Sequence, residues 1–329
     1  MKRRTVLFAV AAGLAAPIAA IAQQQSGVRR IGILSARSRS TTQNPDTYFD
    51  AFVRAMGELG YEEGKNLSTE WRFADGRNER LPALAAELVR LKPEIIVTHA
   101  TAGALAAQGA TRTIPIVFVS AGDPVKSGLV VSLARPGGNI TGLSLLTADI
   151  FPKQLELLRI MLPRMTRVAV LVNAASPNKD RNLRNLRDAA QKLGIEIIAE
   201  DPRTSEEFAR AFSAMKRAGA EAVIILSDSF FIFHRRRIVE LAISSRLPSM
   251  YYHLEDTQAG GLMSYGQNNA DYYRRGATYV DKILKGAKVA ELPIEQPTKI
   301  HLAINLKTAK ALGISVSKEL VFRADEVIE

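Results

Sequence analysis

Short apolar segments alternate with amphipathic segments along most of the chain. The apolar segments are rich in β-branched residues and end in polar turns, as strands do, whereas 46–60 carries apolar residues at helical spacing. Strands that are apolar throughout indicate a parallel sheet covered by helices on both faces. The predicted strands lie at 30–35, 66–73, 94–99, 114–120, 139–145, 167–173, 195–200, 222–227, 247–252, 261–266 and 298–304. They are too numerous for one sheet, so we expect an α/β fold with two sheets in two lobes.

An internal repeat supports two lobes. Each copy begins with Arg and alternating β-branched residues, continues through a polar loop and a helix, and reaches Leu-Gly before a strand. Leu59-Gly60 and Leu193-Gly194 occupy the same place, where glycine ends a helix in left-handed geometry. The first lobe would begin near Gly27 and the second near Ser144. The glycine-rich turn and strand at 135–145 would leave one sheet and enter the other, or form an ordinary strand within one domain.

The first 22 residues have the pattern of an export signal. A basic start at 2–4 precedes an apolar run and a small-x-small triplet that ends at Ala22. Gly13 and Pro17 interrupt the run, which argues against a retained membrane-spanning helix. We expect cleavage after Ala22 and a periplasmic protein, by either the general secretory or the twin-arginine route.

Composition excludes several classes of function. The chain has no cysteine, hence no disulfide, thiolate nucleophile or cysteine metal site. Its net charge of +11 would suit nucleic acid, an anionic surface or an acidic ligand, but export argues against nucleic acid. The basic run 234–237 lacks interleaved aromatic residues and predicts a solvated helix face. The four histidines lack metal-ligand spacing, so we expect no metal.

No catalytic or cofactor motif stands out. The chain lacks a dinucleotide-binding glycine pattern, a phosphate loop and a nucleophile elbow, so we expect no cofactor and no enzyme. Polar residues instead recur near the carboxyl ends of strands, where parallel α/β sheets bind ligands. The candidate ligand-binding residues are Ser35, Thr98, His99, Thr101, Asp123, Ser144, Asn173, Asp228, Tyr252 and Ser264.

Three of these residues have two possible roles each. Thr101 stands at a helix start, where it would cap the helix or help it to bind an anion. Asp123 and Asp228 each follow an apolar strand and would bind an ammonium or sugar hydroxyl, or cap a helix. The small residues Ala121 and Gly122 leave room for a ligand beside Asp123, so capping and ligand binding are compatible there.

Taken together, several longer stretches resemble one family. The chain is similar to the ABC transporter substrate-binding proteins of the tryptophan/tyrosine type, which have the two-lobed type I periplasmic binding protein fold. The resemblance covers nearly all of the chain after the signal. It is carried by 81–144, "FPKQLELL", "RVAVLVN", "GGLMSYG", "INLKTAKALGI" and "RADEVIE".

The resemblance implies a division into lobes and a function. The first lobe would take 27–142 and 259–290, and the second 143–258 and 291–329, with the ligand cleft between them. The protein would be a monomer that captures a small polar solute, best an amino acid or related carboxylate, and delivers it to an ABC permease in the inner membrane. The alternatives are a sensory solute-binding subunit or an exported α/β hydrolase with an aspartate as base.

The resemblance also implies roles for the candidate residues. In the amino-acid-binding pattern of this fold, Thr98 and Thr101 would hold a carboxylate. Asp228 would hold an amine, with Asp123 as a second candidate. His99 would tune the polar end of the ligand, and the cleft would be lined by Ser35, Ser144, Asn173 and Tyr252.

Overall fold

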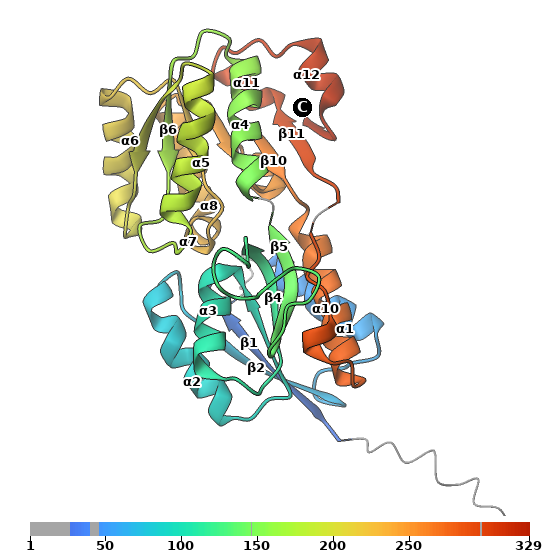
Figure 1. Ribbon diagram of the computed structural model, residues 1–329. Coiled ribbons are helices and arrows are strands. Elements are labelled where there is room, and N and C mark those ends of the chain that lie inside the picture. Colours follow the sequence, from blue (N-terminus) through green and yellow to red (C-terminus); the bar gives the residue numbers. More distant parts are fainter. Residues whose placement is uncertain (1–26, 40–45, 146, 297) are drawn as a thin grey trace, which may run out of the picture.

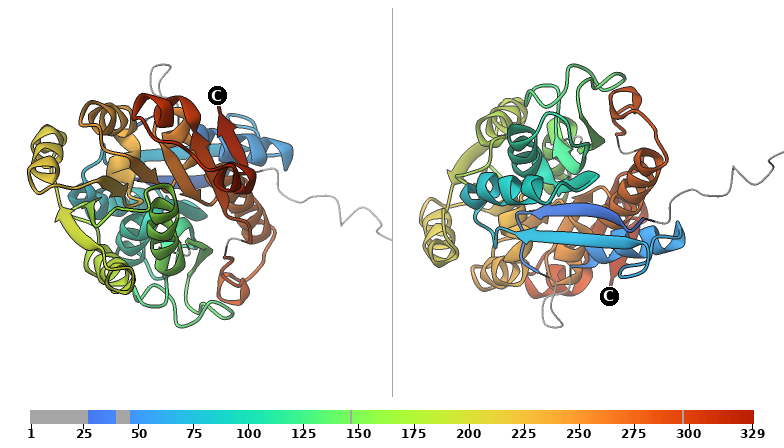
Figure 2. Two further views of the ribbon diagram at one scale, coloured as in Figure 1. Left: turned by 90° about the horizontal axis from the view of Figure 1, so that it is seen from above. Right: turned by 90° about the horizontal axis from the view of Figure 1, so that it is seen from below.

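The chain folds into two α/β lobes, each built around its own sheet (Figure 1). The computed structural model describes residues 27–39, 46–145, 147–296 and 298–329, with the backbone alone at 147 and 148. The predicted signal peptide lies outside the described residues. Helices cover both faces of each sheet, as the views from above and below show (Figure 2). The predicted fold class, two lobes with helix-flanked and mainly parallel sheets, is confirmed.

The first lobe contains a five-stranded sheet in the order β2-β1-β3-β4-β5. All of its neighbouring strands are parallel. The strands are β1 (Arg29–Ser35), β2 (Leu67–Phe73), β3 (Ile95–His99), β4 (Ile116–Gly122) and β5 (Ile140–Leu145). Helices α1 (Thr47–Glu58) and α10 (Asn269–Leu284) pack on one face. Helices α2 (Leu81–Arg90) and α3 (Ala100–Ala110) pack on the other, and η2 (Asn78–Arg80) precedes α2.

The second lobe contains a seven-stranded sheet in the order β12-β11-β10-β9-β8-β6-β7, in which β10 and β11 form the antiparallel pair. Its strands are β6 (Arg167–Leu171), β7 (Glu196–Glu200), β8 (Ala222–Ile225), β9 (Ser249–Tyr251), β10 (Met263–Gly266), β11 (His301–Asn305) and β12 (Glu326–Ile328). Its helices are α4 (Thr147–Met161), α5 (Lys179–Lys192), η3 (Ser205–Glu207), α6 (Phe208–Arg217), α7 (Ser229–Phe233), α8 (Arg235–Ser244), α9 (Leu254–Gln258), α11 (Leu306–Ala311) and α12 (Lys318–Arg323).

The chain passes between the lobes three times, and the crossings differ from the predicted boundaries. β5 is the edge strand of the first sheet, so 143–145 belongs to the first lobe rather than the second. β10 lies in the second sheet, so 263–266 was wrongly assigned to the first lobe. The third crossing follows η4 (Val289–Glu291) and runs beside the first, because the Ser144 N–H donates to the Glu295 carbonyl at 2.8 Å.

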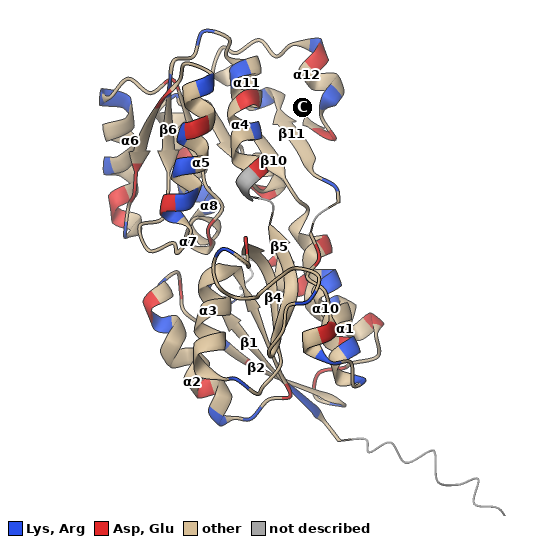
Figure 3. Ribbon diagram, viewed as in Figure 1, with Lys and Arg blue, Asp and Glu red and all other residues tan. Residues whose placement is uncertain are grey.

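The repeated glycines end their helices as predicted. Gly60 follows α1 with φ of +89°, and Gly194 follows α5 with φ of +65°. Basic side chains are spread over the outer helices of both lobes and mixed with acidic ones in the view of Figure 3. Within the described chain, no helix combines the length and apolar character needed to cross a bilayer.

Gly142 in β5 permits a close approach of two strands. Its φ is +150°, and a Cβ there would overlap the backbone of Phe118 in β4. We expect Gly142→Ala to lower the free energy of unfolding by at least about 3 kcal/mol, as urea denaturation would measure. Gly57→Ala is the control, because a Cβ added at this position of α1 would meet open space. That change should leave stability unchanged or raise it by up to about 1 kcal/mol. Equal effects would contradict the role of Gly142.

Candidate functional site

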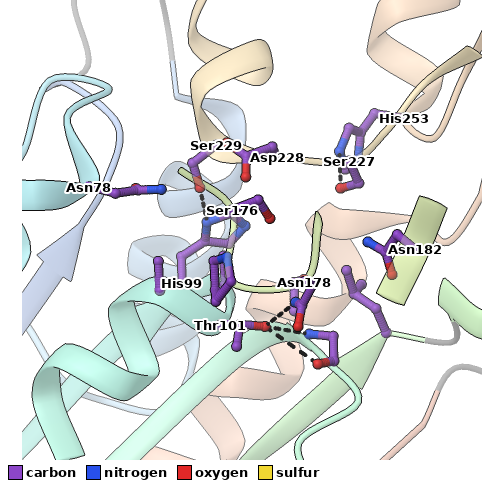
Figure 4. A pocket seen from close by; sticks show the side chains of 16 residues that line it. Asn78, His99, Thr101, Ser176, Asn178, Asn182, Ser227, Asp228, Ser229 and His253 are labelled. Carbon is purple, nitrogen blue, oxygen red and sulfur yellow. Dashed lines mark hydrogen bonds between the residues drawn. The ribbon is translucent and has the colours of Figure 1, made fainter. Parts of the chain in front are cut away.

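Residues from both lobes surround a small polar cavity at the facing edges of the two sheets (Figure 4). Its volume is about 30 Å³, room for one or two waters or a small head group. The first lobe contributes Asn78, His99, Ala100, Thr101, Ala102, Ser120, Gly122 and Leu145. The second contributes Ser176, Pro177, Asn178, Asn182, Ser227, Asp228, Ser229 and His253.

The first-lobe wall is the amino-terminal end of α3. Ala100, Thr101 and Ala102 form its first residues and line the cavity. Within the described part of the chain the N-cap residue, His99, makes no side-chain cap hydrogen bond, so the positive end of the helix dipole lies at the cavity wall without a side-chain cap. Ala100 has φ of +60°, a left-handed conformation that is costly for alanine and that turns the chain sharply from β3 into α3.

The second-lobe wall carries the carboxylate of Asp228, just after β8. One oxygen accepts hydrogen bonds from the Asn173 side chain at 2.8 Å and from the Phe230 N–H at 2.9 Å. Burial raises the pKa of Asp228, while the bonds from Asn173, Phe230 and Ser176 oppose that rise. All of these donors are neutral, and no Lys or Arg is among the described residues that line the cavity. Among the described residues that line the cavity, the carboxylate therefore has no cationic partner.

Two asparagines on one face of α5 complete the site. Asn178, at the start of the helix, reaches across the cleft and donates to the Thr101 hydroxyl at 2.8 Å. Asn182 lies one turn later, is buried, and has a side-chain oxygen without a hydrogen-bond partner among the described residues. A buried amide oxygen without a partner is unfavourable, so the site has an unmet requirement for a donor.

Direct contacts hold the lobes together around the cavity. His99 Nδ1 lies 2.9 Å from the Ser229 hydroxyl, and Asn178 bonds to Thr101. Farther from the cavity, the buried Tyr48 of α1 donates to Glu255 at 2.7 Å and accepts from Arg235 at 3.1 Å. The structure is therefore a closed arrangement of the two lobes.

Two buried histidines of the cleft stay neutral. Burial lowers the pKa of His99 well below its ordinary value, and Arg37 and His253 add to the effect. Burial also lowers the pKa of His253, with Arg235 and Arg37 as further causes. His253 bonds to the Ser227 hydroxyl at 3.0 Å and to the Asn269 amide at 2.8 Å. A histidine held neutral by burial, with guanidinium groups adding to the effect, is a poor general base because its protonated form is disfavoured.

Of the ten candidates from sequence, three line the cavity and one supports it. His99, Thr101 and Asp228 line it. Asn173 does not line it, but its side-chain amide donates a hydrogen bond to Asp228. Thr101 is the second residue of α3, so of its two possible roles the capping role is wrong. Its hydroxyl already bonds to Gly122 and Asn178 within the protein.

The other six candidates lie elsewhere. Asp123 caps the turn that follows β4, by accepting from the Lys126 N–H at 3.1 Å. Thr98 points into the sheet and donates to the Leu34 carbonyl at 3.0 Å, since alternate strand residues face opposite sides. Tyr252 bonds to Gln267 and lines a separate space of about 10 Å³. The remaining three candidates, Ser35, Ser144 and Ser264, are buried outside the cavity lining.

Sequence reasoning missed several lining residues. Ser227, Ser229 and His253 adjoin strand ends that were already recognised, so the same rule could have found them. Asn178 and Asn182 come from a helix and carry no strand-end signal. Arg235 also differs from prediction. It is not on a solvated face but forms an ion pair with Asp256 at 2.6 Å, with its side chain 20% exposed.

Two α/β lobes that meet at a polar cleft define a two-lobed solute-binding protein of the type I periplasmic class. The family model for "ABC transporter substrate binding protein" matches residues 43–328, and the chain belongs to this family. Its members bind a small-molecule solute, work with a membrane permease and are typically extracytoplasmic. This chain is accordingly the solute-capturing component of an ABC transporter.

Individual relatives are similar to this chain in sequence or in fold. A "Tyrosine-binding protein" of Clostridioides difficile is 28% identical over 268 residues, which span 80% of this chain and 75% of the relative. A crystal structure of a conserved domain protein from Vibrio cholerae has a TM-score of 0.84 at 27% identity, over 91% of this chain and 99% of that one. A Streptococcus pneumonia ABC domain in complex with L-Trp has a TM-score of 0.82 at 24% identity, over the same shares.

The neutral histidines predict a pH dependence of stability. A lowered folded-state pKa means that the unfolded chain binds more protons, so stability is present above the unfolded pKa of about 6.5 and is lost as pH falls below it. The expected slope is about 1.4 kcal/mol per pH unit each for His99 and His253. The half-buried His234, whose pKa is also lowered, adds to it.

Urea unfolding between pH 5.5 and 7.5 would measure this slope. Because this range is centred on the unfolded pKa, His99→Asn should remove about 1.4 kcal/mol from the total change in the free energy of unfolding across it. His301→Gln, in β11 and outside the cavity lining, should keep the full slope. A wild-type slope near zero, or an equal loss in both variants, would contradict the assignment.

Proposed function

We propose that the solute is an α-amino acid, held as a zwitterion between Asp228 of the second lobe and the start of α3 in the first. The observation that carries the proposal is the half-buried Asp228 carboxylate, whose partners are neutral donors only. A ligand ammonium would supply the missing positive charge and form charge-assisted hydrogen bonds. Burying an ionised carboxylate otherwise costs free energy that neutral donors offset only in part.

The carboxylate of the same ligand would bind at the start of α3. The free N–H groups there and the positive end of the helix dipole favour an anion. The bonded hydroxyl of Thr101 and the buried hydroxyl of Thr98 make backbone donors better candidates than these side chains. This proposal keeps the predicted carboxylate position at α3 and replaces the predicted side-chain donors.

Asn182 supports the presence of a ligand with a donor group. Its buried oxygen has no partner among the described residues, and an ammonium held by Asp228 in the same cavity has further N–H groups to donate. One small ligand would thus satisfy both unmet groups of the second-lobe wall.

The relatives agree with an amino-acid ligand. One is named a tyrosine-binding protein, and one solved structure holds L-Trp. We further propose that the mature protein begins after Ala22, is periplasmic and monomeric, and releases its solute unchanged to the inner-membrane permease. The neutral, cation-flanked histidines of the cleft support binding without turnover.

Asp228→Asn tests the ammonium site. Asparagine keeps an oxygen that can accept from Phe230 but removes the negative charge, so we expect the Kd for the amino acid to rise about 10- to 100-fold. Isothermal titration calorimetry with a panel of amino acids would measure it. Asp123→Asn is the matched control, because that residue caps a turn outside the cavity lining and should leave Kd within about twofold. Unchanged affinity in Asp228→Asn would overturn the assignment.

Asn182→Ala tests the unpaired amide. Removing a buried oxygen without a partner should leave the ligand-free free energy of unfolding within about 1 kcal/mol of wild type. The Kd should nevertheless rise about 5- to 10-fold, since one ligand hydrogen bond is lost. Urea unfolding and calorimetry on the same sample separate the two effects. An unchanged Kd would show that Asn182 has no ligand contact.

A further inference from the structure

Tyr48 makes a contact between the lobes that lies outside the ligand cavity. It belongs to α1 of the first lobe, and its hydroxyl donates to Glu255 of α9 at 2.7 Å and accepts from Arg235 of α8 at 3.1 Å. Both partners belong to the second lobe. None of these three residues, which we call the interlobe clasp, lines the polar cavity. The clasp can therefore be altered without touching a ligand held there, unlike the bond from Asn178 to Thr101.

The first lobe holds the Tyr48 ring in position. The residue is 2% exposed, and its ring stacks on Tyr273 of α10 with the ring centroids 5.7 Å apart. The Arg37 guanidinium lies 5.1 Å from the centroid of the same ring and is paired with Asp46, directly before α1. Because these neighbours all belong to the first lobe, we expect the ring to keep its orientation when the lobes separate.

The second lobe holds the receiving groups in the same way. Arg235 uses its Nε to pair with Asp256 at 2.6 Å and its Nη2 to donate to Tyr48. Hydrogen bonds with an ionised partner are stronger than neutral ones, and the Tyr48 hydroxyl makes two of them. Burial raises the pKa of Tyr48 well above its ordinary value, and Glu255 adds to the rise while Arg235 opposes it. The hydroxyl therefore keeps its proton and remains a donor to Glu255.

We propose that Tyr48 determines affinity without contacting the solute, because its bonds to Glu255 and Arg235 stabilise the closed form. The inference rests on the proposed function, in which the solute is held between closed lobes. A ligand that needs the closed form binds with an apparent Kd equal to its intrinsic Kd divided by the closed fraction. Loss of the clasp lowers that fraction, so it raises the Kd of every ligand by one common factor.

Tyr48→Phe tests the clasp, because it removes the hydroxyl and keeps the packed ring. Calorimetric titration with L-tryptophan, L-tyrosine and L-alanine should give a Kd about tenfold higher for each, with their order of affinity unchanged. Tyr61→Phe is the matched control. The Tyr61 hydroxyl donates to the Asp281 carboxylate at 3.0 Å, and both residues belong to the first lobe. This variant loses the same kind of bond within one lobe, so its Kd values should stay within about twofold of wild type.

A distance between the lobes reports closure directly. The chain has no cysteine, so Glu79→Cys and Ala175→Cys would create the only two sites for spin labels. These exposed residues belong to different lobes and line one opening between them. Pulsed electron paramagnetic resonance of ligand-free protein should find a smaller closed fraction in Tyr48→Phe than in wild type and Tyr61→Phe.

A double-mutant cycle checks that Tyr48 acts through its carboxylate partner. Glu255→Gln weakens the same contact by removing the charge of the acceptor. The double variant with Tyr48→Phe should therefore raise the Kd by less than the product of the two single effects. A full product of the two effects would overturn the pairing of these residues in closure.

The outcomes separate the two proposals. A common rise in Kd that Tyr61→Phe does not share supports the clasp, and a smaller closed fraction supports it independently. The clasp is overturned if Tyr48→Phe leaves Kd and closed fraction unchanged, or changes Kd by different factors for different amino acids. If no amino acid binds, the proposed function is overturned, and a ligand-free closed fraction that Tyr48→Phe does not lower overturns the clasp as well. Thermal unfolding verifies that Tyr48→Phe is folded, and Glu255→Gln takes its place in both measurements if it is not.

Discussion

The direction of the strands determines where this protein can bind a solute. The first sheet is wholly parallel and the second nearly so, which places the carboxyl ends of successive strands along one edge of each sheet. Loops and helix starts follow those ends, and the two edges face each other across the cleft. His99 at the end of β3 and Asp228 after β8 therefore meet in one cavity although 129 positions separate them in the chain numbering.

Charge is distributed in the cleft so that the cavity itself retains an unmatched carboxylate. Arg37 and Arg235 lie nearby, but Arg37 is paired with Asp46 and Arg235 with Asp256. Besides burial, Arg37 disfavours protonation of both histidines, and Arg235 disfavours protonation of His253. The cavity thus combines one anionic side chain, neutral imidazoles and an uncapped helix start. A neutral zwitterion complements these features better than a simple anion, which Asp228 would repel.

The contacts that close the lobes come from the same segments as the proposed ligand site. Asn178 bonds across the cleft to Thr101 and belongs to the helix that also carries Asn182. Ser229 bonds to His99 and adjoins Asp228. A ligand that bridges the start of α3 and Asp228 adds contacts to both lobes that exist only when they are closed. It therefore shifts the population toward the closed form by its differential affinity for the two states.

Local pattern was sufficient for the first eleven strands and for the place of Asp228 after β8, but not for β12. Strand and helix periods, glycines 60 and 194, and a carboxylate after an apolar strand are readable from neighbouring residues alone. Tertiary structure decided what depends on distant pairing. β10 lies in the second sheet. Thr98 points into the core while the adjacent His99 lines the cavity. Asp123 caps a turn. Tertiary structure also brought Asn182 to the site from a helix. A strand's sheet, and the side of it that faces a ligand, are set by hydrogen bonds and packing with segments far away in the chain, which a local pattern does not contain.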